Sequence, residues 1–174
     1  MTNTYGFANN MREEKVVMLE NHKGRWHNSY DPNRDFPFNT KPQSCLNTVA
    51  GRVIYKLMVE NLFVTAITFH GGINVIGYPW GSNNHLLSRN GRKYVANEAP
   101  DHVALHNLGE AMLEAAGEEI KSLAARQTID KYILGDMTST VYPVGGGMED
   151  WGYGGGWDNL PGTDAGFEKC EPQT

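Results

Sequence analysis

The chain has 174 residues, a length that suits one compact domain better than two. Hydrophobic residues make up 40% of the chain and charged residues 20%, so the chain can bury a core and is not disordered throughout. Fifteen Lys and Arg against twenty Asp and Glu give a net charge of −5, which argues against a nucleic-acid partner. No apolar run approaches the roughly 18 residues of a membrane span.

The first predicted helix covers residues 43–60. Residues 1–41, before it, have the composition of a polar loop interrupted by Gly and Pro. Apolar residues then recur at i, i+3, i+4 and i+7, the spacing of one face of an amphipathic helix. The residues of this apolar face are Leu46, Val49, Ala50, Val53, Ile54, Leu57 and Met58.

An almost unbroken apolar run, Leu62 to Phe69, follows this helix. Eight residues are short for a helix, and the absence of polar alternation predicts a strand buried on both faces, in the middle of an α/β sheet. A second strand is predicted over residues 73–80, and residues 81–98 have the composition of a loop.

A second helix is predicted from Pro100 to Ala116, because Pro suits the first turn and Gly117 is a natural stop. Residues 118–125 would add another helical turn, and residues 141–144 a short edge strand. The order of helix, buried strand, helix and short strand predicts a layered α/β fold. The inner face of the second helix would carry Leu105, Leu108, Met112 and Ala115.

His70 is the first candidate functional residue, because it ends the predicted buried strand and precedes Gly71 and Gly72. Ligands of open α/β sheets bind outside the carboxyl ends of strands, and glycines let the chain turn sharply or let a ligand approach. An imidazole in that place suits a metal ligand or a general base. The alternative is a histidine that caps the strand and bonds only to backbone.

A second cluster lies in residues 24–37, where Arg25 and Arg34 flank Asn33 among aromatic residues. A guanidinium takes a carboxylate with two parallel hydrogen bonds, and an Asn adds a donor beside it. The cluster therefore predicts a site for a small anionic ligand, with a solvated loop as the alternative.

A third cluster, residues 142–151, carries three successive glycines after Tyr142. It has neither the Gly-Lys-Ser/Thr nor the GxGxxG spacing of phosphate loops, which favours a mobile, Tyr-bearing loop near a pocket. The sequence also lacks HExxH, CxxC, His-x-x-Glu and GxSxG patterns. The remaining histidines are interpreted as surface or packing residues: His22, His27, His85, His102 and His106.

Taken in order, these motifs resemble the zinc carboxypeptidase family, the funnelin-type metallocarboxypeptidases of digestion and prohormone processing. The resemblance extends over about residues 3–157, and the order and spacing of the short motifs make it specific. The motifs are Asn3-x-x-Gly6-Phe7, Gly24-Arg25, Asp31-x-Asn33-Arg34-x-Phe36-Pro37, His70-Gly71-Gly72, Tyr78-Pro79 and Tyr142-Pro143-Val144-x-Gly146-Gly147-Met148-x-Asp150-Trp151.

The resemblance implies a role for each matching residue. His70 would be the third ligand of a catalytic Zn²⁺. Asn33 and Arg34 would grip the free C-terminal carboxylate of a peptide or protein substrate. Arg25, one residue closer to that pair than in the family pattern, would stabilise the tetrahedral oxyanion. Tyr142 would close over the bound terminal residue.

Glu149 falls at the floor of the family's specificity pocket, where an acid goes with C-terminal Lys or Arg. Prohormone-processing relatives carry an acid at the position of Gly81 instead, so Glu149 is the one candidate for that role. The alternative is that Glu149 is a surface acid in a loop.

The chain departs from the family at two points. The first two zinc ligands of the family come from a His-x-x-Glu, which is absent, and the general-base Glu lies on a strand after the Trp151 segment. Glu168 and Glu171 lie in a loop-like stretch, and neither is assigned as that base. We therefore expect residues 1–174 to be an incomplete catalytic domain. Its partial α/β fold would be a mixed sheet flanked by helices, cut at both ends, without peptidase activity in isolation.

Two other functions compete with the enzyme. One is a non-catalytic carboxypeptidase-like module that binds peptide C-termini, and the other is a carbohydrate-binding module, suggested by Trp80, Trp151 and Trp157. Two cysteines leave one disulfide or two free thiols open. The resembling proteins are mostly secreted or in secretory organelles, where Cys45 and Cys170 would pair.

Overall fold

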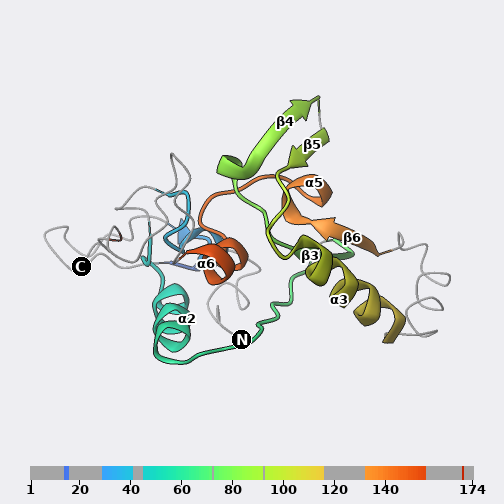
Figure 1. Cartoon of the computed structure of the whole chain (residues 1–174). Coiled ribbons are helices and arrows are strands. Elements are labelled where there is room, and N and C mark those ends of the chain that lie inside the picture. Colours follow the sequence, from blue (N-terminus) through green and yellow to red (C-terminus); the bar gives the residue numbers. More distant parts are fainter. Residues whose placement is uncertain are drawn as a thin grey trace, which may run out of the picture. The chain divides into compact units, whose positions relative to one another are not determined.

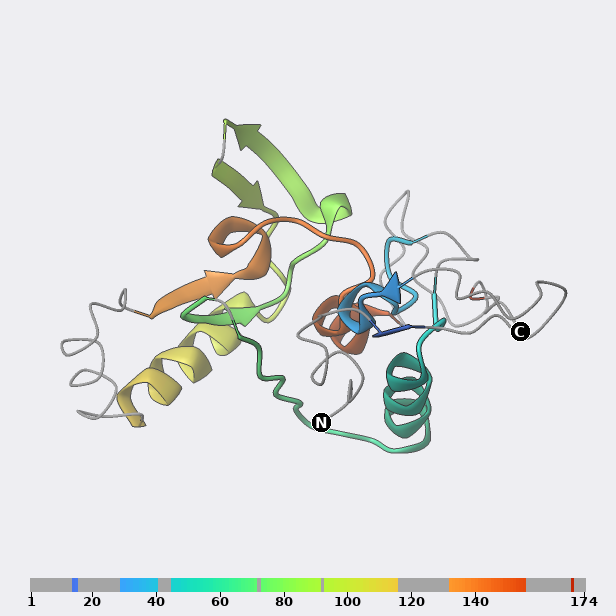
Figure 2. The ribbon, with the colours of Figure 1, turned by 180° about the vertical axis from the view of Figure 1, so that it is seen from behind.

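The computed structural model describes residues 14–15, 29–40, 45–71, 73–91, 93–115, 132–155 and 170. The chain divides into two compact units, which we describe separately. The first unit comprises Met1–Ala66 and Val144–Thr174, and the second comprises Ile67–Pro143. Figures 1 and 2 show the ribbon from opposite sides.

The first unit contains two longer helices and a short antiparallel strand pair. The elements in chain order are β1 (Glu14–Lys15), β2 (Ser29–Tyr30), the 3-10 turn η1 (Pro32–Arg34), α2 (Val49–Glu60) and α6 (Met148–Gly154). The helix predicted over 43–60 is therefore confirmed from residue 49 onward. It starts later than predicted because Leu46 has a φ of +53°, outside the helical region, and because Thr48 caps the helix by accepting a hydrogen bond from the Gly51 N–H at 2.8 Å.

One side of α2 packs against the rest of the first unit. Ala50 and Gly51 are buried, whereas Val49, Val53 and Leu57 each remain more than half exposed. The predicted apolar face is thus only partly used. The buried core of the unit includes Phe36 and Trp151, and the Trp151 ring stacks with those of Phe36 and Tyr55, with both centroid distances at 5.1 Å.

The second unit is built on two parallel strands covered by a helix (Figure 1). Strand β3 pairs in parallel with β6, and α3 contacts both strands. A hairpin and two short helical segments complete the unit. Its elements are β3 (Val75–Tyr78), η3 (Asn83–His85), β4 (Leu86–Asn90), β5 (Lys93–Ala96), α3 (His102–Ala115), β6 (Ile133–Asp136) and α5 (Met137–Thr140).

Helix α3 confirms the helix predicted over 100–116, but it does not use all of the predicted inner face. Gly109 is buried against Leu134 of β6, where an added Cβ would lie 2.3 Å from the leucine Cδ1. Leu108 instead is half exposed. Strand β3 likewise confirms the strand predicted over 73–80.

The sequence missed three strands of the second unit, and also the short helical segments η3 and α5. Strands β4 and β5 form an antiparallel hairpin within 81–98, and its turn contains Gly91 with a φ of +60°. Strand β6 was also not predicted. The edge strand predicted over 141–144 is wrong, because those residues form a turn and irregular backbone. The helical turn predicted over 118–125 lies outside the described residues.

The strand predicted over Leu62–Phe69 is also wrong. These residues form irregular backbone and are exposed, with Val64 and Phe69 at 103% and 93% of their reference accessibility. A strand needs a neighbour that satisfies its backbone groups, and within the described residues no strand pairs with this segment. The apolar composition of the segment is therefore not sufficient to make it a strand.

The α/β class is confirmed, since helices accompany both parallel and antiparallel strand pairs. Among the described residues these pairs form separate two-stranded sheets. The part of the chain that the structure describes contains no helix long and apolar enough to cross a membrane.

Candidate substrate-binding site

Asn33 and Arg34 lie on the short turn η1, which the local sequence specifies. Asp31 caps the turn: its carboxylate accepts a hydrogen bond from Asn33 N at 3.0 Å, and its carbonyl accepts one from Arg34 N at 2.9 Å. Pro32 occupies the first position, where its fixed φ suits a helical turn. The Asp-Pro-Asn-Arg order therefore fixes the backbone of both candidate binding residues.

A long-range hydrogen bond holds this turn against α6. The Met148 N–H donates to the Asn33 side-chain oxygen at 2.9 Å, although the two residues are 115 positions apart. Because the side-chain oxygen is the acceptor, the bond orients the amide, whose Nδ2 group is a donor that suits a carboxylate.

The glycine-rich segment before α6 pairs with the chain that follows η1. Phe36 N donates to Gly146 O at 3.1 Å, and Gly146 N donates to Phe38 O at 2.7 Å. Gly146 has a φ of +72°, and a Cβ there would lie 2.3 Å from the Arg34 carbonyl oxygen. Only glycine fits this approach, so the segment packs directly behind the Asn33-Arg34 turn.

The Arg34 side chain is half buried, and its Nη1 donates to the carbonyl of Asn33. A guanidinium has five N–H donors, and the bond to the Asn33 carbonyl uses one of them. The arrangement places a cation and an amide donor on adjacent residues of one rigid turn.

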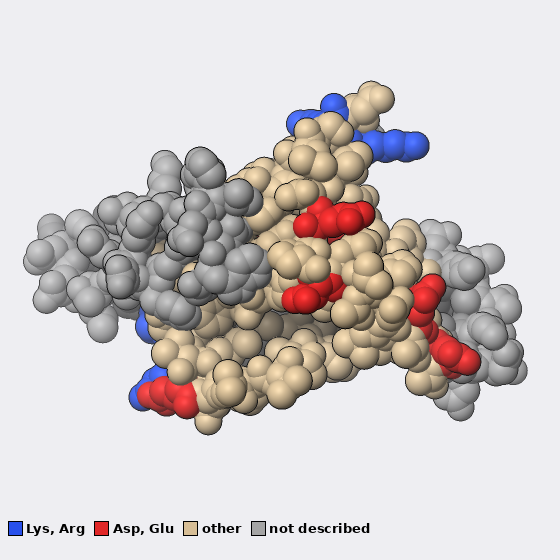
Figure 3. Space-filling view, in the orientation of Figure 1, with Lys and Arg blue, Asp and Glu red and all other residues tan. Residues whose placement is uncertain are grey.

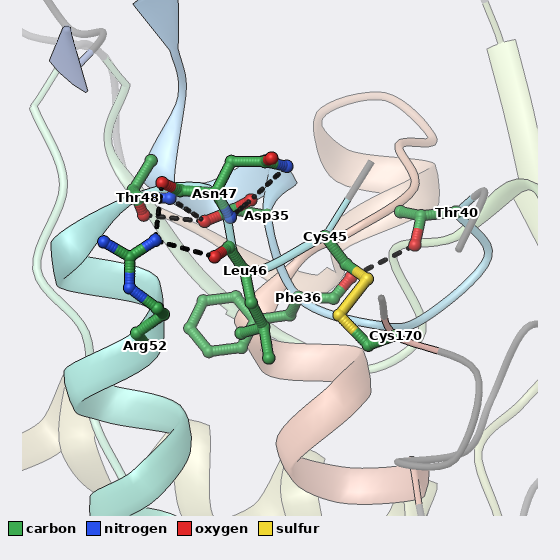
Figure 4. Close-up of a disulfide and its surroundings, with 9 residues drawn as sticks. All are labelled: Asp35, Phe36, Thr40, Cys45, Leu46, Asn47, Thr48, Arg52 and Cys170. Atoms are coloured by element: carbon green, nitrogen blue, oxygen red, sulfur yellow. Dashed lines mark hydrogen bonds between the residues drawn. A yellow bond between two sulfur atoms is a disulfide. The ribbon is translucent and has the colours of Figure 1, made fainter. Parts of the chain in front are cut away.

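Asp35 is a buried carboxylate that sequence reasoning did not single out (Figure 4). Its Oδ1 accepts from Asn47 N at 2.8 Å, and its Oδ2 accepts from Thr48 N at 2.8 Å and from Thr48 Oγ1 at 2.7 Å. Burial raises the pKa of the Asp35 carboxyl, and these hydrogen bonds oppose that rise. Asp35 thus connects the binding turn to the start of α2.

The same region is held by a disulfide between Cys45 and Cys170 (Figure 4). Arg52 adds two bonds from α2, because its Nη1 donates to the carbonyls of Leu46 and Asn47 at 3.0 and 2.8 Å. The cysteines therefore form one disulfide, one of the two states that their number alone leaves open.

Glu149 follows Met148 in the first turn of α6, within the same unit as Asn33 and Arg34. Its carboxylate folds back over Gly147, where an added Cβ would lie 2.4 Å from Oε1. The hydrogen bond between Met148 and Asn33 therefore joins the turn η1, which carries Asn33 and Arg34, to helix α6, which carries Glu149.

The other predicted site residues belong to the second unit or lie outside the described residues. His70 and Tyr142 belong to the second unit, where His70 is exposed in irregular backbone and Tyr142 is 44% exposed after α5. Arg25 lies outside the described residues.

Within the described residues, the surroundings of His70 do not by themselves fit a catalytic zinc. Such an ion takes three protein ligands, and the described residues contain no group of three His, Cys, Asp or Glu positioned to hold a metal. We therefore derive no chemical step through zinc from this chain.

A sequence model of the zinc carboxypeptidase family matches residues 10–158. The match covers most of the chain and confirms the resemblance that the ordered motifs indicate. A comparison with curated proteins gives no match.

Proposed function

The chain belongs to the zinc carboxypeptidase family, and we propose that it forms the part of a catalytic domain that recognises the C-terminus of a peptide or protein substrate. The family membership implies a hydrolase that uses Zn²⁺. The finer proposals concern which residues bind the substrate and which terminal residue is preferred.

The observation that carries this proposal is the hydrogen bond from Met148 N to the Asn33 side chain. It supports a binding turn whose two side chains have a fixed backbone and complementary roles. Arg34 would supply the charge and Asn33 the neutral donor for a terminal carboxylate. A clamp for a chain end explains why such an enzyme would remove only the last residue.

Glu149 is proposed as the specificity residue for C-terminal Lys or Arg. Its position directly after Met148 supports this role, because the same helix turn contacts the proposed clamp. Tyr142 is proposed to close over the bound residue, and Arg25 to stabilise the oxyanion.

His70 is proposed as one zinc ligand of the complete domain. The sequence contains no His-x-x-Glu, so the other ligands and the general base would come from residues outside this sequence. We accordingly propose that residues 1–174 are an incomplete catalytic domain that does not hydrolyse peptides alone. Plasma mass spectrometry of the purified chain and of His70→Ala tests this, and stoichiometric zinc that is lost in His70→Ala would contradict it.

The binding role is tested with a fluorescent peptide ending in Lys, measured by anisotropy. We expect binding to weaken about tenfold or more on amidation of the peptide C-terminus, and equally in Arg34→Gln. Arg89→Gln is the matched control, because Arg89 lies on β4 and stacks over Tyr94. Equal binding of the free and amidated peptides would refute the clamp.

Specificity needs a second comparison, between peptides that end in Lys and in Leu. Glu149→Gln should remove most of the preference for Lys and leave the effect of amidation intact. If the preference persists in Glu149→Gln, another residue sets the specificity.

A non-catalytic module that binds peptide C-termini is the second candidate. The observation in its favour is that the described residues provide no three-ligand metal group. The longer coding sequence discriminates between the two, because a His-x-x-Glu and a Glu-bearing strand encoded there would support the enzyme.

A further inference from the structure

Helix α3 presents two histidines one turn apart, and neither is among the residues proposed for substrate binding. His102 and His106 are both half exposed, and their ring centroids lie 6.1 Å apart with ring planes inclined by 23°. A spacing of four places both side chains on one helix face. The sequence had indicated only surface or packing roles for them.

The distance between the rings fits two ligands of one metal ion. A metal–nitrogen bond of about 2.1 Å, plus about 1.2 Å from nitrogen to ring centre, lets each ring reach about 3.3 Å from the ion. Two such rings lie about 6.6 Å apart when they face each other across the ion and about 5.4 Å apart at the tetrahedral angle, and the observed 6.1 Å lies between these values.

Tyr78 supports one of these rings from the end of β3. Its hydroxyl lies 3.1 Å from His106 Nδ1, and its ring meets His102 edge-on at 5.6 Å. When Nδ1–H donates to the phenol oxygen, the lone pair is on Nε2, the tautomer that binds a metal. Tyr78 is itself buried, so it holds the His106 ring in a defined orientation.

Glu110, one further turn along α3, brings a carboxylate to the same nitrogen. Its Oε1 lies 3.6 Å from His106 Nε2, which is too long for a hydrogen bond. The carboxylate therefore lies beside the two histidines and adds negative charge there, without completing a group of three ligands in the described residues.

The charges around the site favour a cation. Glu98 and Asp136 are close enough to Tyr78 to act on it electrostatically, and α3 contains no Lys or Arg. Figure 3 shows acidic side chains over this part of the molecule and basic ones at the tip of the β4–β5 hairpin.

We propose that His102 and His106 chelate one divalent transition-metal ion, with water in the other coordination positions and Glu110 as a carboxylate at its edge. In the described residues no three such side chains are already positioned as ligands, so the site has two protein ligands at its centre. Imidazole ligands favour Cu²⁺ over Ni²⁺ and Zn²⁺ and discriminate against Mg²⁺ and Ca²⁺. The proposed site does not include His70, the proposed zinc ligand.

The test is titration of the untagged protein with Cu²⁺ and with Zn²⁺, followed by calorimetry and, for Cu²⁺, by electron paramagnetic resonance. We expect one Cu²⁺ site with two coordinated imidazole nitrogens, bound more tightly than Zn²⁺. His102→Asn and His106→Asn should each weaken it about tenfold or more, and Tyr78→Phe by about tenfold.

Two control variants make the result specific. His70→Ala tests whether the ion binds at the proposed catalytic ligand, and His22→Ala with His27→Ala removes two histidines elsewhere in the sequence. Both controls should leave the affinity unchanged. A resonance spectrum with fewer than two nitrogens, or an affinity insensitive to His102→Asn and His106→Asn, would overturn the proposal even if the peptide-binding function holds.

Discussion

Replacing Asp35 should destabilise the first unit more than any exposed carboxylate would. The carboxylate accepts bonds from the backbone N–H groups of Asn47 and Thr48 and from the Thr48 hydroxyl, all of them buried. Asp35→Ala leaves two buried amides without acceptors, at about 1–3 kcal/mol each, so we expect the free energy of unfolding to fall by about 2–6 kcal/mol. Asp35→Asn keeps one acceptor oxygen and should cost about 1–3 kcal/mol.

The pH dependence gives a second, independent measure of the same carboxyl. Its pKa is raised in the folded protein, chiefly by burial, so the folded state retains the proton to higher pH than the unfolded state. The contribution of Asp35 is therefore largest below its unfolded pKa of 3.8 and decreases as pH rises through the raised folded pKa. The destabilisation caused by Asp35→Ala should accordingly shrink from about pH 4 upward and then level off.

Urea unfolding followed by circular dichroism, at several pH values, measures both quantities. Glu60→Ala is the control, because its pair with Lys56 at 3.8 Å is exposed and should contribute less than about 0.5 kcal/mol. Hydrogen exchange should show the first turn of α2 opening more readily in Asp35→Ala. If Asp35→Ala lowers the free energy of unfolding by less than about 1 kcal/mol, Asp35 does not stabilise the start of α2 as proposed. If the destabilisation by Asp35→Ala grows with pH, the hydrogen bonds lower the pKa of Asp35 by more than burial raises it.

Two further predictions concern the backbone and the disulfide. Gly146→Ala combines a positive φ with a clash at a backbone oxygen and should cost about 2–4 kcal/mol in urea unfolding. Gly91→Ala, with a positive φ but open space, should cost about 1 kcal/mol, and Gly71→Ala close to none; equal losses would contradict the steric explanation. Reduction of the disulfide, or Cys45→Ser, should lower stability by about 3–5 kcal/mol because the bridge spans 125 residues, and an unchanged urea midpoint would argue against the bridge.

Local sequence predicted the elements that local forces specify. The apolar spacing of α2, the start of α3 after Pro100 and the short strand β3 are all specified by residues close together in the chain. The start of α2 could not be predicted in this way, because it depends on Asp35. This residue holds Asn47 and Thr48, twelve and thirteen residues later, in a non-helical arrangement. The burial of a carboxylate leaves no periodic signal.

Strand pairing was the weakest part of the prediction, since a strand depends on partners that composition does not name. The run Leu62–Phe69 has the composition of a central strand yet pairs with nothing in the described residues. Residues Ile133–Asp136, for which the sequence predicted no strand, instead pair with β3, more than fifty residues away along the chain. Polar residues on the β4–β5 hairpin hid a pairing that Gly91, in the turn after Asn90, favours.

The candidate site depends both on contacts between neighbouring residues and on contacts between distant parts of the chain. The backbone of the Asn33-Arg34 turn is fixed by its immediate neighbours Asp31 and Pro32. The motif could be recognised in the sequence for that reason. Its support is not local, because Gly146 and Met148 hold the turn from more than a hundred residues away.

This coupling has a functional consequence. A substitution at Gly146 displaces the backbone behind Arg34 and also the segment that leads to Met148. Because the Met148 N–H orients the Asn33 amide, the same displacement would disturb both donors of the proposed carboxylate clamp. The glycine-rich segment therefore acts as the structural base of the clamp, and a phosphate-binding role is not needed to explain its three glycines.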